Sequence, residues 1–341
     1  MERTTLAPPR RIQLSHEEAV AEWPAGGPLL GKWVGDPQRP IDRRELDGPA
    51  KAREHKRRWF DPRGWFRTIE RAASHHLSRN IYPRLPGLSW PYSRILERKL
   101  CLSEAKIPMR GLPAAFDGTR VLVVSDIHAG PFVSPRTLAR TLDRLVALQP
   151  DLILLPGDLL TAHAGEWAVH RDAFLKLRAP LGTYAVMGNH DHYTGEIETV
   201  IASAEEAGIT VLHNRCHQLR RGGETLSLAG VDDLVMGGPD LDAALDGAEN
   251  PVILVSHNPD MLFDAARRGV ALMLSGHTHG GQVRLPGLPV LVRQSRYRLD
   301  EGRFEVGGTQ AIVTRGLGAV GVPLRFRCAP EALWLTLKSE S

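Results

Sequence analysis

The chain has 341 residues, of which 42% are hydrophobic, so it is long enough for one large domain or two ordinary ones with a substantial core. Its three cysteines, Cys101, Cys216 and Cys328, are far apart, which argues against both a disulfide framework and a thiolate metal site. The N-terminal residues lack the apolar segment of a secretory signal, and charges interrupt every window long enough to cross a membrane. We therefore expect a cytoplasmic protein.

The net charge of +4 is unevenly distributed along the chain. Residues 1–116 contain 22 Lys and Arg against 13 Asp and Glu, whereas the remaining residues contain 21 against 26. Opposite net charges in two parts of one chain indicate two separate roles. We expect a basic N-terminal extension over residues 1–106, part flexible and part amphipathic helical, and a second domain over residues 107–341.

Within the extension, residues 1–50 are rich in Pro and Gly and predict an extended arm. Residues 51–80 predict two helical pieces separated at Pro62, and residues 93–100 predict a short helix. Aromatic residues next to Lys and Arg are typical of a membrane interface, although the same aromatic residues are equally suited to packing against the second domain. These aromatic residues are Trp59, Phe60, Trp65, Phe66, Trp90 and Tyr92.

Beyond residue 107, apolar runs predict strands and amphipathic segments predict helices. The helix expected over residues 134–149 has Ser134 as its N-cap and Pro135 in its first turn. Further helices are expected over residues 196–208 and 259–269. Strands are expected at residues 120–125, 152–156, 184–187, 209–212, 252–256 and 271–275, with a hairpin across 220–224 and a last pair of strands at 311–314 and 332–337. This alternation predicts an α/β fold in which two mixed sheets pack together and helices cover them.

Side chains that bind metals follow five of these strands, at the point where each strand ends. Sites in open α/β sheets form outside the carboxyl ends of the strands, so we expect these side chains to lie together. Each one alone is as well explained by a helix cap or a turn, and only their recurrence favours a shared site. They are Asp126 and His128, then Asp158, then Asn189 with His190 and Asp191, then His257, and finally His277 with His279.

The composition of this set points to particular metals. Aspartate, asparagine and histidine without sulfur suit Mn, Fe, Zn or similar divalent ions, and there are too many imidazoles for a Ca or Mg cage. The set is about twice as large as one ion needs, so we expect two divalent ions. Two such ions would clamp phosphoryl oxygens and generate hydroxide near neutral pH.

The motifs "SDIHAG", "PGDLL", "MGNHDHY", "SHNPD" and "SGHTHGGQ" resemble those of the calcineurin-like metallophosphoesterases, and in particular a bacterial branch of small phosphodiesterases. The resemblance covers roughly residues 107–337, so the second domain is expected to be the metallophosphoesterase domain. It implies a four-layer αββα sandwich. It also implies two ligand sets that share one bridging aspartate: Asp126, His128, Asp158 and His279 for one ion, and Asp158, Asn189, His257 and His277 for the other.

The same resemblance implies a reaction. A metal-bridging hydroxide would attack phosphorus in line, and His190 would stabilise or protonate the leaving oxygen. Asp191 is expected to support catalysis by orienting His190 or its loop. Arg315 and Arg325 are expected near the substrate, where a phosphate contact and an ordinary salt bridge are both open interpretations.

The substrate class stays open at this stage. The resemblance implies a phosphoester or pyrophosphate, and in some relatives the substrate is a lipid-linked nucleotide sugar such as UDP-2,3-diacylglucosamine. The alternatives are a cyclic-nucleotide phosphodiesterase, a phosphomonoesterase, a nuclease, and a scaffold that binds a membrane or nucleic acid without catalysis. No nucleic-acid motif is present, so no specific nucleic acid is expected. The extension predicts peripheral attachment to an anionic membrane surface.

Overall fold

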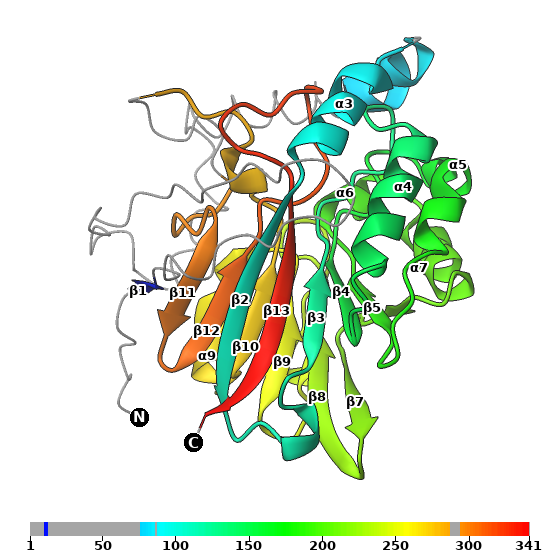
Figure 1. Ribbon diagram of the computed structural model, residues 1–341. Coiled ribbons are helices and arrows are strands. Elements are labelled where there is room, and N and C mark those ends of the chain that lie inside the picture. The colour runs from blue at the N-terminus through cyan, green and yellow to red at the C-terminus, as the bar shows by residue number, and fades with distance from the viewer. Residues whose placement is uncertain (1–9, 13–75, 86, 287–293, 341) are drawn as a thin grey trace.

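The computed structural model describes residues 10–12, 76–85, 87–286 and 294–340. In these ranges it contains two mixed β-sheets that pack face to face (Figure 1). The six-stranded sheet has the order β2-β13-β3-β4-β5-β6, and the seven-stranded sheet has the order β1-β11-β12-β10-β9-β8-β7. The predicted pair of mixed sheets is confirmed.

The strands of the six-stranded sheet are β2 (Cys101–Arg110), β3 (Arg120–Val123), β4 (Leu152–Pro156), β5 (Thr183–Val186), β6 (Thr210–Val211) and β13 (Glu331–Glu340). Those of the other sheet are β1 (Arg10–Ile12), β7 (Arg215–Arg221), β8 (Glu224–Gly230), β9 (Val252–Val255), β10 (Leu272–Ser275), β11 (Gly302–Val306) and β12 (Thr309–Val313). The α-helices are α3 (Ser89–Lys99), α4 (Pro135–Val146), α5 (Gly165–Phe174), α6 (Asn189–Tyr193), α7 (Ile197–Glu206), α8 (Leu241–Ala244) and α9 (Leu262–Arg267). None of the helices in the described ranges is both long and apolar enough to span a membrane.

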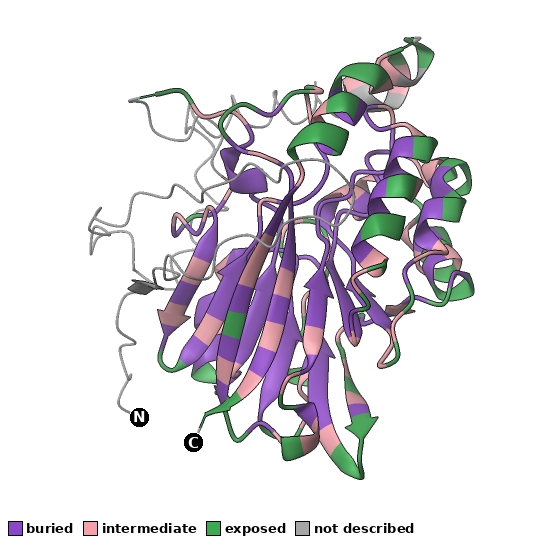
Figure 2. Ribbon diagram, in the orientation of Figure 1, coloured by how far each residue is buried: buried purple, intermediate pink, exposed green. Residues whose placement is uncertain are grey.

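Three apolar clusters define the layers. One lies between the two sheets, a second between the six-stranded sheet and helices α4, α5 and α7, and a third under α8 and α9 on the other sheet. Figure 2 shows the central strands buried along most of their length, while the helices are exposed on one side. This is the expected four-layer αββα arrangement, because strands buried on both faces need helices on the outside.

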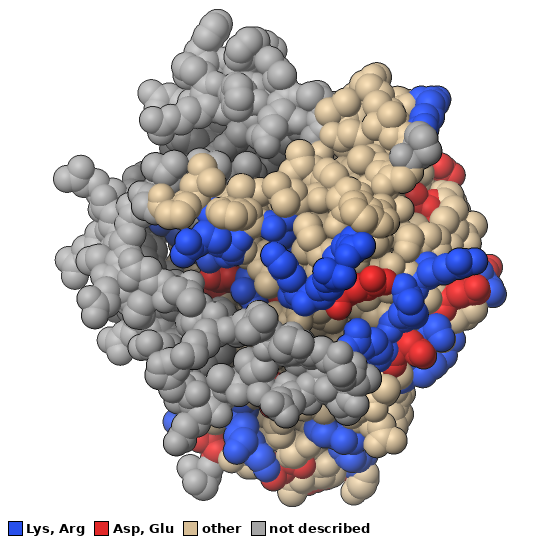
Figure 3. Space-filling view, turned by 45° about the horizontal axis from the view of Figure 1, so that its top comes forward, with Lys and Arg blue, Asp and Glu red and all other residues tan. Residues whose placement is uncertain are grey.

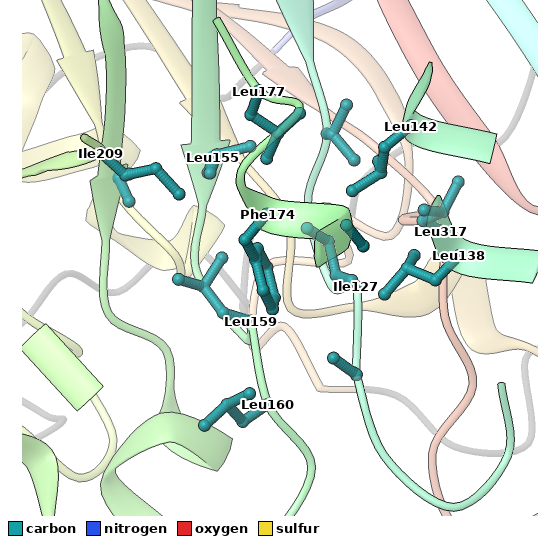
Figure 4. Packing of buried hydrophobic residues seen from close by; sticks show 14 of the residues in the cluster. Ile127, Leu138, Leu142, Leu155, Leu159, Leu160, Phe174, Leu177, Ile209 and Leu317 are labelled. Carbon is teal, nitrogen blue, oxygen red and sulfur yellow. The ribbon is translucent and has the colours of Figure 1, made fainter. Parts of the chain in front are cut away.

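The second cluster illustrates how amphipathic helices cover the sheet. Leu138 and Leu142 of α4 and Phe174 of α5 are fully buried against Leu155 of β4 (Figure 4). The N-cap prediction for α4 is confirmed, since the side chain of Ser134 accepts a hydrogen bond from the Thr137 amide at 3.1 Å. Apolar residues at helical spacing therefore place α4 directly beside the strands whose ends carry the site.

Two expectations need correction. The strands at 311–314 and 332–337 do not pair with each other: β12 lies between β11 and β10 in one sheet, and β13 lies between β2 and β3 in the other. The boundary expected between residues 106 and 107 lies inside β2, which pairs with β13 along its whole length. A proline at position 108 weakened the strand pattern in the sequence, but proline is tolerated here because β2 is an edge strand.

Helix α3 also belongs to the folded unit. Tyr92 and Leu96 are buried in the core cluster, and the Tyr92 hydroxyl donates to the carbonyl oxygens of Leu317 and Gly318 at 2.5 and 2.8 Å. We therefore propose that the extension ends before α3, with its segment β1 paired to β11 at the edge of the seven-stranded sheet. Within the arm predicted at residues 1–50, the described residues are Arg10–Ile12, which form β1, and of the helical pieces predicted at residues 51–80, residues 51–75 lie outside the described residues.

We predict that Leu96→Ala lowers the free energy of unfolding of the full chain by about 2–5 kcal/mol, because it leaves a cavity in the core. Leu85→Ala removes the same atoms from a side chain that is 47% exposed and should change stability by less than about 0.5 kcal/mol. Urea denaturation followed by circular dichroism measures both values. Equal effects of the two substitutions would contradict the packing of α3 into the core.

Candidate metal centre

The seven expected ligand residues converge at one edge, where the carboxyl ends of β3, β4 and β5 meet those of β9 and β10. This edge lies toward the top of Figure 1. Every one of the seven is buried, and none exposes more than 5% of its surface. Burying so many polar side chains is costly unless they bind one another or a ligand, so the cluster is either a network or a binding site.

The first group comprises Asp126, His128, Asp158 and His279, whose ligand atoms all lie within 4.8 Å of one another. The Nε2 atoms of His128 and His279 are 3.0 Å apart. His128 Nε2 lies 3.4 Å from Asp158 Oδ2, and His279 Nε2 lies 3.4 Å from Asp126 Oδ1. Two nitrogen and two carboxylate donors thus face a common point.

The second group is centred on His257. Its Nε2 atom lies 3.2 Å from Asn189 Oδ1, 3.1 Å from His277 Nδ1 and 3.3 Å from Asp158 Oδ2. Its Nδ1 atom is 2.8 Å from the carbonyl oxygen of Pro156, which can only accept, so Nδ1 carries the proton and Nε2 faces the cluster. Because the same Asp158 oxygen contacts both groups, Asp158 stands between them.

The backbone adopts unusual conformations to present these side chains. Five of the seven have positive φ angles between 45° and 71°: Asp126, His128, Asp158, His277 and His279. Positive φ is uncommon for residues other than glycine, and clusters of such residues occur at functional sites. The site therefore contains local strain that the surrounding fold must hold in place.

Two glycines allow the loops to approach one another. A Cβ atom on Gly276 would lie 2.2 Å from Asp126 Oδ2, and one on Gly188 would lie 2.2 Å from Asp158 Oδ1. Both distances are far too short for any side chain, so only glycine fits at these positions. These glycines thus allow the loop after β10 to lie against that after β3, and the loop after β5 against that after β4.

The histidines of the first group are uncharged. Burial lowers the pKa of His128 to about 3, with a further contribution from the neighbouring His190. Burial and the proximity of His128 likewise hold the pKa of His279 well below its ordinary value. Neutral imidazole is the form that coordinates a metal, because the ring nitrogen then keeps a free electron pair.

The carboxylates favour positive charge at the centre of the cluster. Burial opposes ionisation of Asp158, but the charge of His257 outweighs it and holds the pKa of Asp158 well below its ordinary value. Burial also opposes a charged His257, yet Asp158 and Asp126 raise the His257 pKa to about 10. Burial raises the pKa of Asp126 itself to about 6. Cationic charge is therefore stabilised between the two aspartates.

These observations test whether the residues fit divalent cations. The donors are carboxylate, amide and imidazole, which suit Mn, Fe or Zn, and two groups of four donors share one carboxylate, while a bound cation would take the place of the proton on His257 Nε2. Each group supplies four donors, with Asp158 counted in both. The donor set therefore fits two divalent cations.

His190 lies at the edge of the cluster and is partly exposed. Its ring packs against that of His128 with centroids 4.7 Å apart, and its backbone amide donates to Asp158 Oδ1 at 2.8 Å. Its Nδ1 atom is 2.7 Å from the carbonyl oxygen of Thr161. A carbonyl oxygen only accepts, so Nδ1 carries a proton and Nε2 is the atom left to exchange one.

Asp191 contacts the backbone of the loops that carry the candidate ligands. Its carboxylate is fully buried and accepts hydrogen bonds from the amides of Leu159, Leu160 and Gly188 at 2.9–3.2 Å. These bonds tie the loop after β4 to the loop after β5. Asp191 thus positions the loops that carry Asp158 and His190, as one of the two sequence interpretations anticipated.

Both arginines contact other groups of the protein. Arg315 is paired with two carboxylates, Glu331 at 2.8 Å and Glu301 at 3.8 Å, which corresponds to the salt-bridge alternative. Arg325 is 5% exposed and donates to the carbonyl oxygens of Gly318, Arg315 and His279 at 2.7–3.3 Å. A second nitrogen of Arg325 lies 3.1 Å from His279 Nδ1. Arg325 thus supports His279, a candidate metal ligand, through its backbone carbonyl and the ring nitrogen that does not face the cluster.

Comparison with known proteins places these motifs in a family. Residues 119–281 match the family model described as calcineurin-like phosphoesterase. The metallophosphoesterase YkuE of Bacillus subtilis is 33% identical over 264 residues, which cover 74% of this chain and 91% of that protein. The chain belongs to the calcineurin-like metallophosphoesterase family.

Two further relatives add detail about the family. The phosphodiesterase YaeI of Escherichia coli is 32% identical over 64% of this chain and 82% of its own length. A "transmembrane protein with metallophosphoesterase domain" from Danio rerio is 33% identical over 69% of this chain, but only 56% of that protein is covered. This metallophosphoesterase is therefore a hydrolase of phosphoesters, and its family uses a dinuclear divalent metal site.

Some groups that support the metallophosphoesterase site cannot be recognised from the sequence. The Thr161 carbonyl that orients His190 is a backbone group, so no residue type identifies it. The Tyr92 hydroxyl, 3.2 Å from Arg325, supports the site from a helix that we had assigned to the extension. Such contacts depend on tertiary structure and could be found only in the folded chain.

We predict that Asp158→Asn reduces metal affinity by more than the roughly 10–100-fold that loss of an outer-shell partner costs, because the central carboxylate contacts both groups. Asp143→Asn on α4, whose side chain is 65% exposed, is the matched control and should bind metal normally. Metal content after dialysis measures the effect. Wild-type metal content in Asp158→Asn would contradict the central position of Asp158.

Proposed function

We propose that this metallophosphoesterase hydrolyses phosphodiester or pyrophosphate bonds at the edge described above. The observation that carries the proposal is that two donor groups share a single oxygen, Asp158 Oδ2. When bound, two divalent cations neutralise phosphoryl oxygens and lower the pKa of a coordinated water. The remaining task of the protein is to orient the phosphoryl group and to move a proton.

The proposed ligand sets follow the two groups. Asp126, His128, Asp158 and His279 would hold one cation, and Asp158, Asn189, His257 and His277 would hold the other. In the described chain these donors approach one another from two different sheets. A cation at either position therefore also stabilises the packing of the sheets at this edge.

His190 is the proposed proton donor. Its Nδ1 proton is held by the Thr161 carbonyl at 2.7 Å, and its ring lies beside that of His128 at the rim of the cluster. In the imidazolium form Nε2 can therefore protonate the leaving oxygen, while the Thr161 carbonyl stabilises the charge. The remaining ring neighbour is Tyr193, at 5.1 Å, which limits rotation of the imidazole.

The substrate class that we favour is a phosphodiester. The name of the Escherichia coli relative, a phosphodiesterase, supports this choice. A panel of substrates distinguishes the phosphodiester from four alternatives: a lipid-linked nucleotide sugar, a cyclic nucleotide, a phosphomonoester and a nucleic acid. Because Arg315 and Arg325 are both engaged by the protein, groups other than these arginines must recognise the rest of the substrate.

The test of this function is hydrolysis of bis-p-nitrophenyl phosphate by the purified full chain. We expect activity that a chelator abolishes and added Mn restores, because the donor set fits such an ion. p-Nitrophenyl phosphate, a cyclic nucleotide and an oligonucleotide assayed in parallel separate the competing substrate classes. Metal-loaded protein that cleaves none of these phosphoesters contradicts the proposal.

We predict that His190→Ala lowers kcat on the diester by about 10²–10⁴-fold, as expected for loss of a general acid, and retains the wild-type metal content. His213→Ala replaces a histidine whose side chain is 48% exposed and serves as the control, with wild-type kcat. Metal analysis and kinetics are made on the same preparations. Loss of metal in His190→Ala would show instead that His190 is a ligand.

We also propose that the basic extension attaches the chain peripherally to an anionic membrane surface. The charge imbalance of residues 1–116 supports this role, since each basic residue near such a surface contributes about 1 kcal/mol. The structure corrects one detail, because Tyr92 is fully buried and is not available to lipid. Trp90 is 62% exposed, and the other four aromatic residues lie outside the described residues.

Salt dependence tests the attachment. We expect the full chain to sediment with anionic vesicles at low salt and several-fold less at 1 M salt, where the screening length falls to about 3 Å. The double substitution Arg57→Glu, Arg58→Glu should weaken binding, whereas the same change at Arg220 and Arg221 on β7 should not. Substitutions are used because a truncation at the expected boundary near residue 106 would cut through β2. Equal binding by both double variants would contradict a role for the extension.

A further inference from the structure

Large exposed apolar side chains gather around the metal centre. Three exposed large apolar side chains among the described residues belong to other segments: Val169 of α5, and Leu234 and Met236 in the loop after β8, a strand that runs parallel to β9. The others belong to three segments: residues 81–90, 283–286 and 320–327. We define the apolar rim as six of them, each 39–62% exposed: Leu85, Trp90, Leu285, Val322, Leu324 and Phe326.

Hydrogen bonds join these segments into one surface. The Tyr82 hydroxyl donates to the carbonyl oxygen of Gly321 at 2.9 Å, which connects the segment before α3 to the loop after β12. The Phe326 amide donates to the Gln282 carbonyl, and the Arg284 amide donates to the Phe326 carbonyl, both at 3.0 Å. The rim is therefore a continuous feature of the folded chain and not a set of independent loops.

The rim borders the metal centre directly. Arg325 stands between Leu324 and Phe326 in the chain, and its guanidinium contacts both the carbonyl oxygen and the Nδ1 atom of His279. Gln282 follows His279 by three residues, and its side chain donates to the carbonyl oxygens of Val320 and Val322 at 2.9 and 3.3 Å. A partner that covers the apolar rim would therefore lie next to the metal centre.

The tip of the rim, residues 322–324, has backbone amides that are already hydrogen-bonded within the protein, as an apolar environment requires. The Val322 amide donates to the Val320 carbonyl and the Leu324 amide donates to the Val322 carbonyl, both at 2.8 Å. Pro323 has no amide hydrogen. Every backbone donor from Val322 to Leu324 is therefore satisfied within the loop, and such a tip can leave water without exposing an unpaired donor.

The charges around the rim are basic. No Asp or Glu occurs in residues 80–94, 282–286 or 319–328, whereas Arg84, Arg94 and Arg327 are exposed. The guanidinium of Arg94 lies 5.1 Å from the centre of the Trp90 ring, a pairing suited to the boundary between water and lipid. Figure 3, which brings this edge toward the viewer, shows Lys and Arg, with some Asp and Glu between them, along the border of a largely uncharged area.

Two neighbouring carboxylates are already neutralised. Glu97 pairs with Arg140 on α4 at 2.5 Å, and Glu301 pairs with Arg284 at 2.7 Å. The surface that surrounds the rim thus offers cations to a partner while its carboxylates are engaged within the protein. A partner with a negatively charged surface and an apolar interior complements it on both counts.

We propose that the apolar rim docks on an anionic lipid bilayer, with Val322 and Leu324 entering the interface and the arginines contacting headgroups. This orientation places the metal centre against the membrane. The inference rests on the proposed function only in that the docked edge carries the hydrolytic site. It adds a contact made by the folded unit to the attachment proposed for the basic extension.

The experiment measures binding of the full chain to vesicles of phosphatidylcholine and phosphatidylglycerol, without substrate or turnover. We expect the double substitution Val322→Glu, Leu324→Glu to weaken binding by about tenfold or more, since it removes two apolar contacts and adds charges that lipid phosphates repel. Val169→Glu introduces the same side chain at an exposed apolar site on α5 and should bind within about twofold of wild type. High salt screens the electrostatic part of the attachment. We therefore expect the wild-type chain to retain some vesicle binding at high salt and the rim variant to lose that remaining binding.

Three results would overturn the proposal. The first is a full chain that ignores the vesicles even at low salt. The second is a rim variant that binds as tightly as Val169→Glu, which would leave attachment to the extension alone. The third is a rim variant with unchanged vesicle binding and a Tm clearly below that of Val169→Glu, which would show that the rim packs against another part of this chain. Because no outcome uses hydrolysis, failure of the docking and failure of the proposed function are distinguishable.

Discussion

The structure around the metal centre depends on a carboxylate that is 1% exposed, that of Asp158. Removing a charge from water is costly unless partners compensate for it. Here the partners are His257 and His128 from two different sheets, together with the His190 amide. The same contacts that stabilise the carboxylate therefore also fix where the two sheets meet. A divalent cation on either side is the partner that this negative charge best accommodates.

The close approach of the loops follows from that requirement. Donors carried by separate strands can share one point only if their backbones nearly touch, and Gly188 and Gly276 remove the Cβ atoms that would prevent it. The positive φ angles of Asp126 and His277 are a second consequence, since each turns its side chain inward immediately after a strand. Asp191 holds this arrangement by binding amides from two loops. The fold thus uses buried polar bonds to maintain a strained site.

Features encoded in short segments could be predicted from the sequence. Helix α4 is an example, because Ser134 caps it and its apolar residues recur at helical spacing. The ligand residues were also accessible, because each directly follows an apolar strand and the parallel strands end at one edge. Strand β2 was not, since Pro108 interrupts its pattern and its pairing partner β13 is distant in sequence. The roles of Arg315 and Arg325 were inaccessible for a related reason: their partners are distant in sequence.

The polar centre and the apolar rim are parts of one arrangement. Arg325 contacts His279 on one side and the Tyr92 hydroxyl on the other, and Tyr92 anchors α3, whose first turn carries the exposed Trp90. A movement of α3 relative to the sheets would therefore disturb a residue of the metal centre. The buried contacts between rim and centre are directional hydrogen bonds, whereas the outward contacts of the rim are apolar and non-directional. Such a surface can adapt to a fluid partner such as a bilayer while the geometry behind it stays fixed.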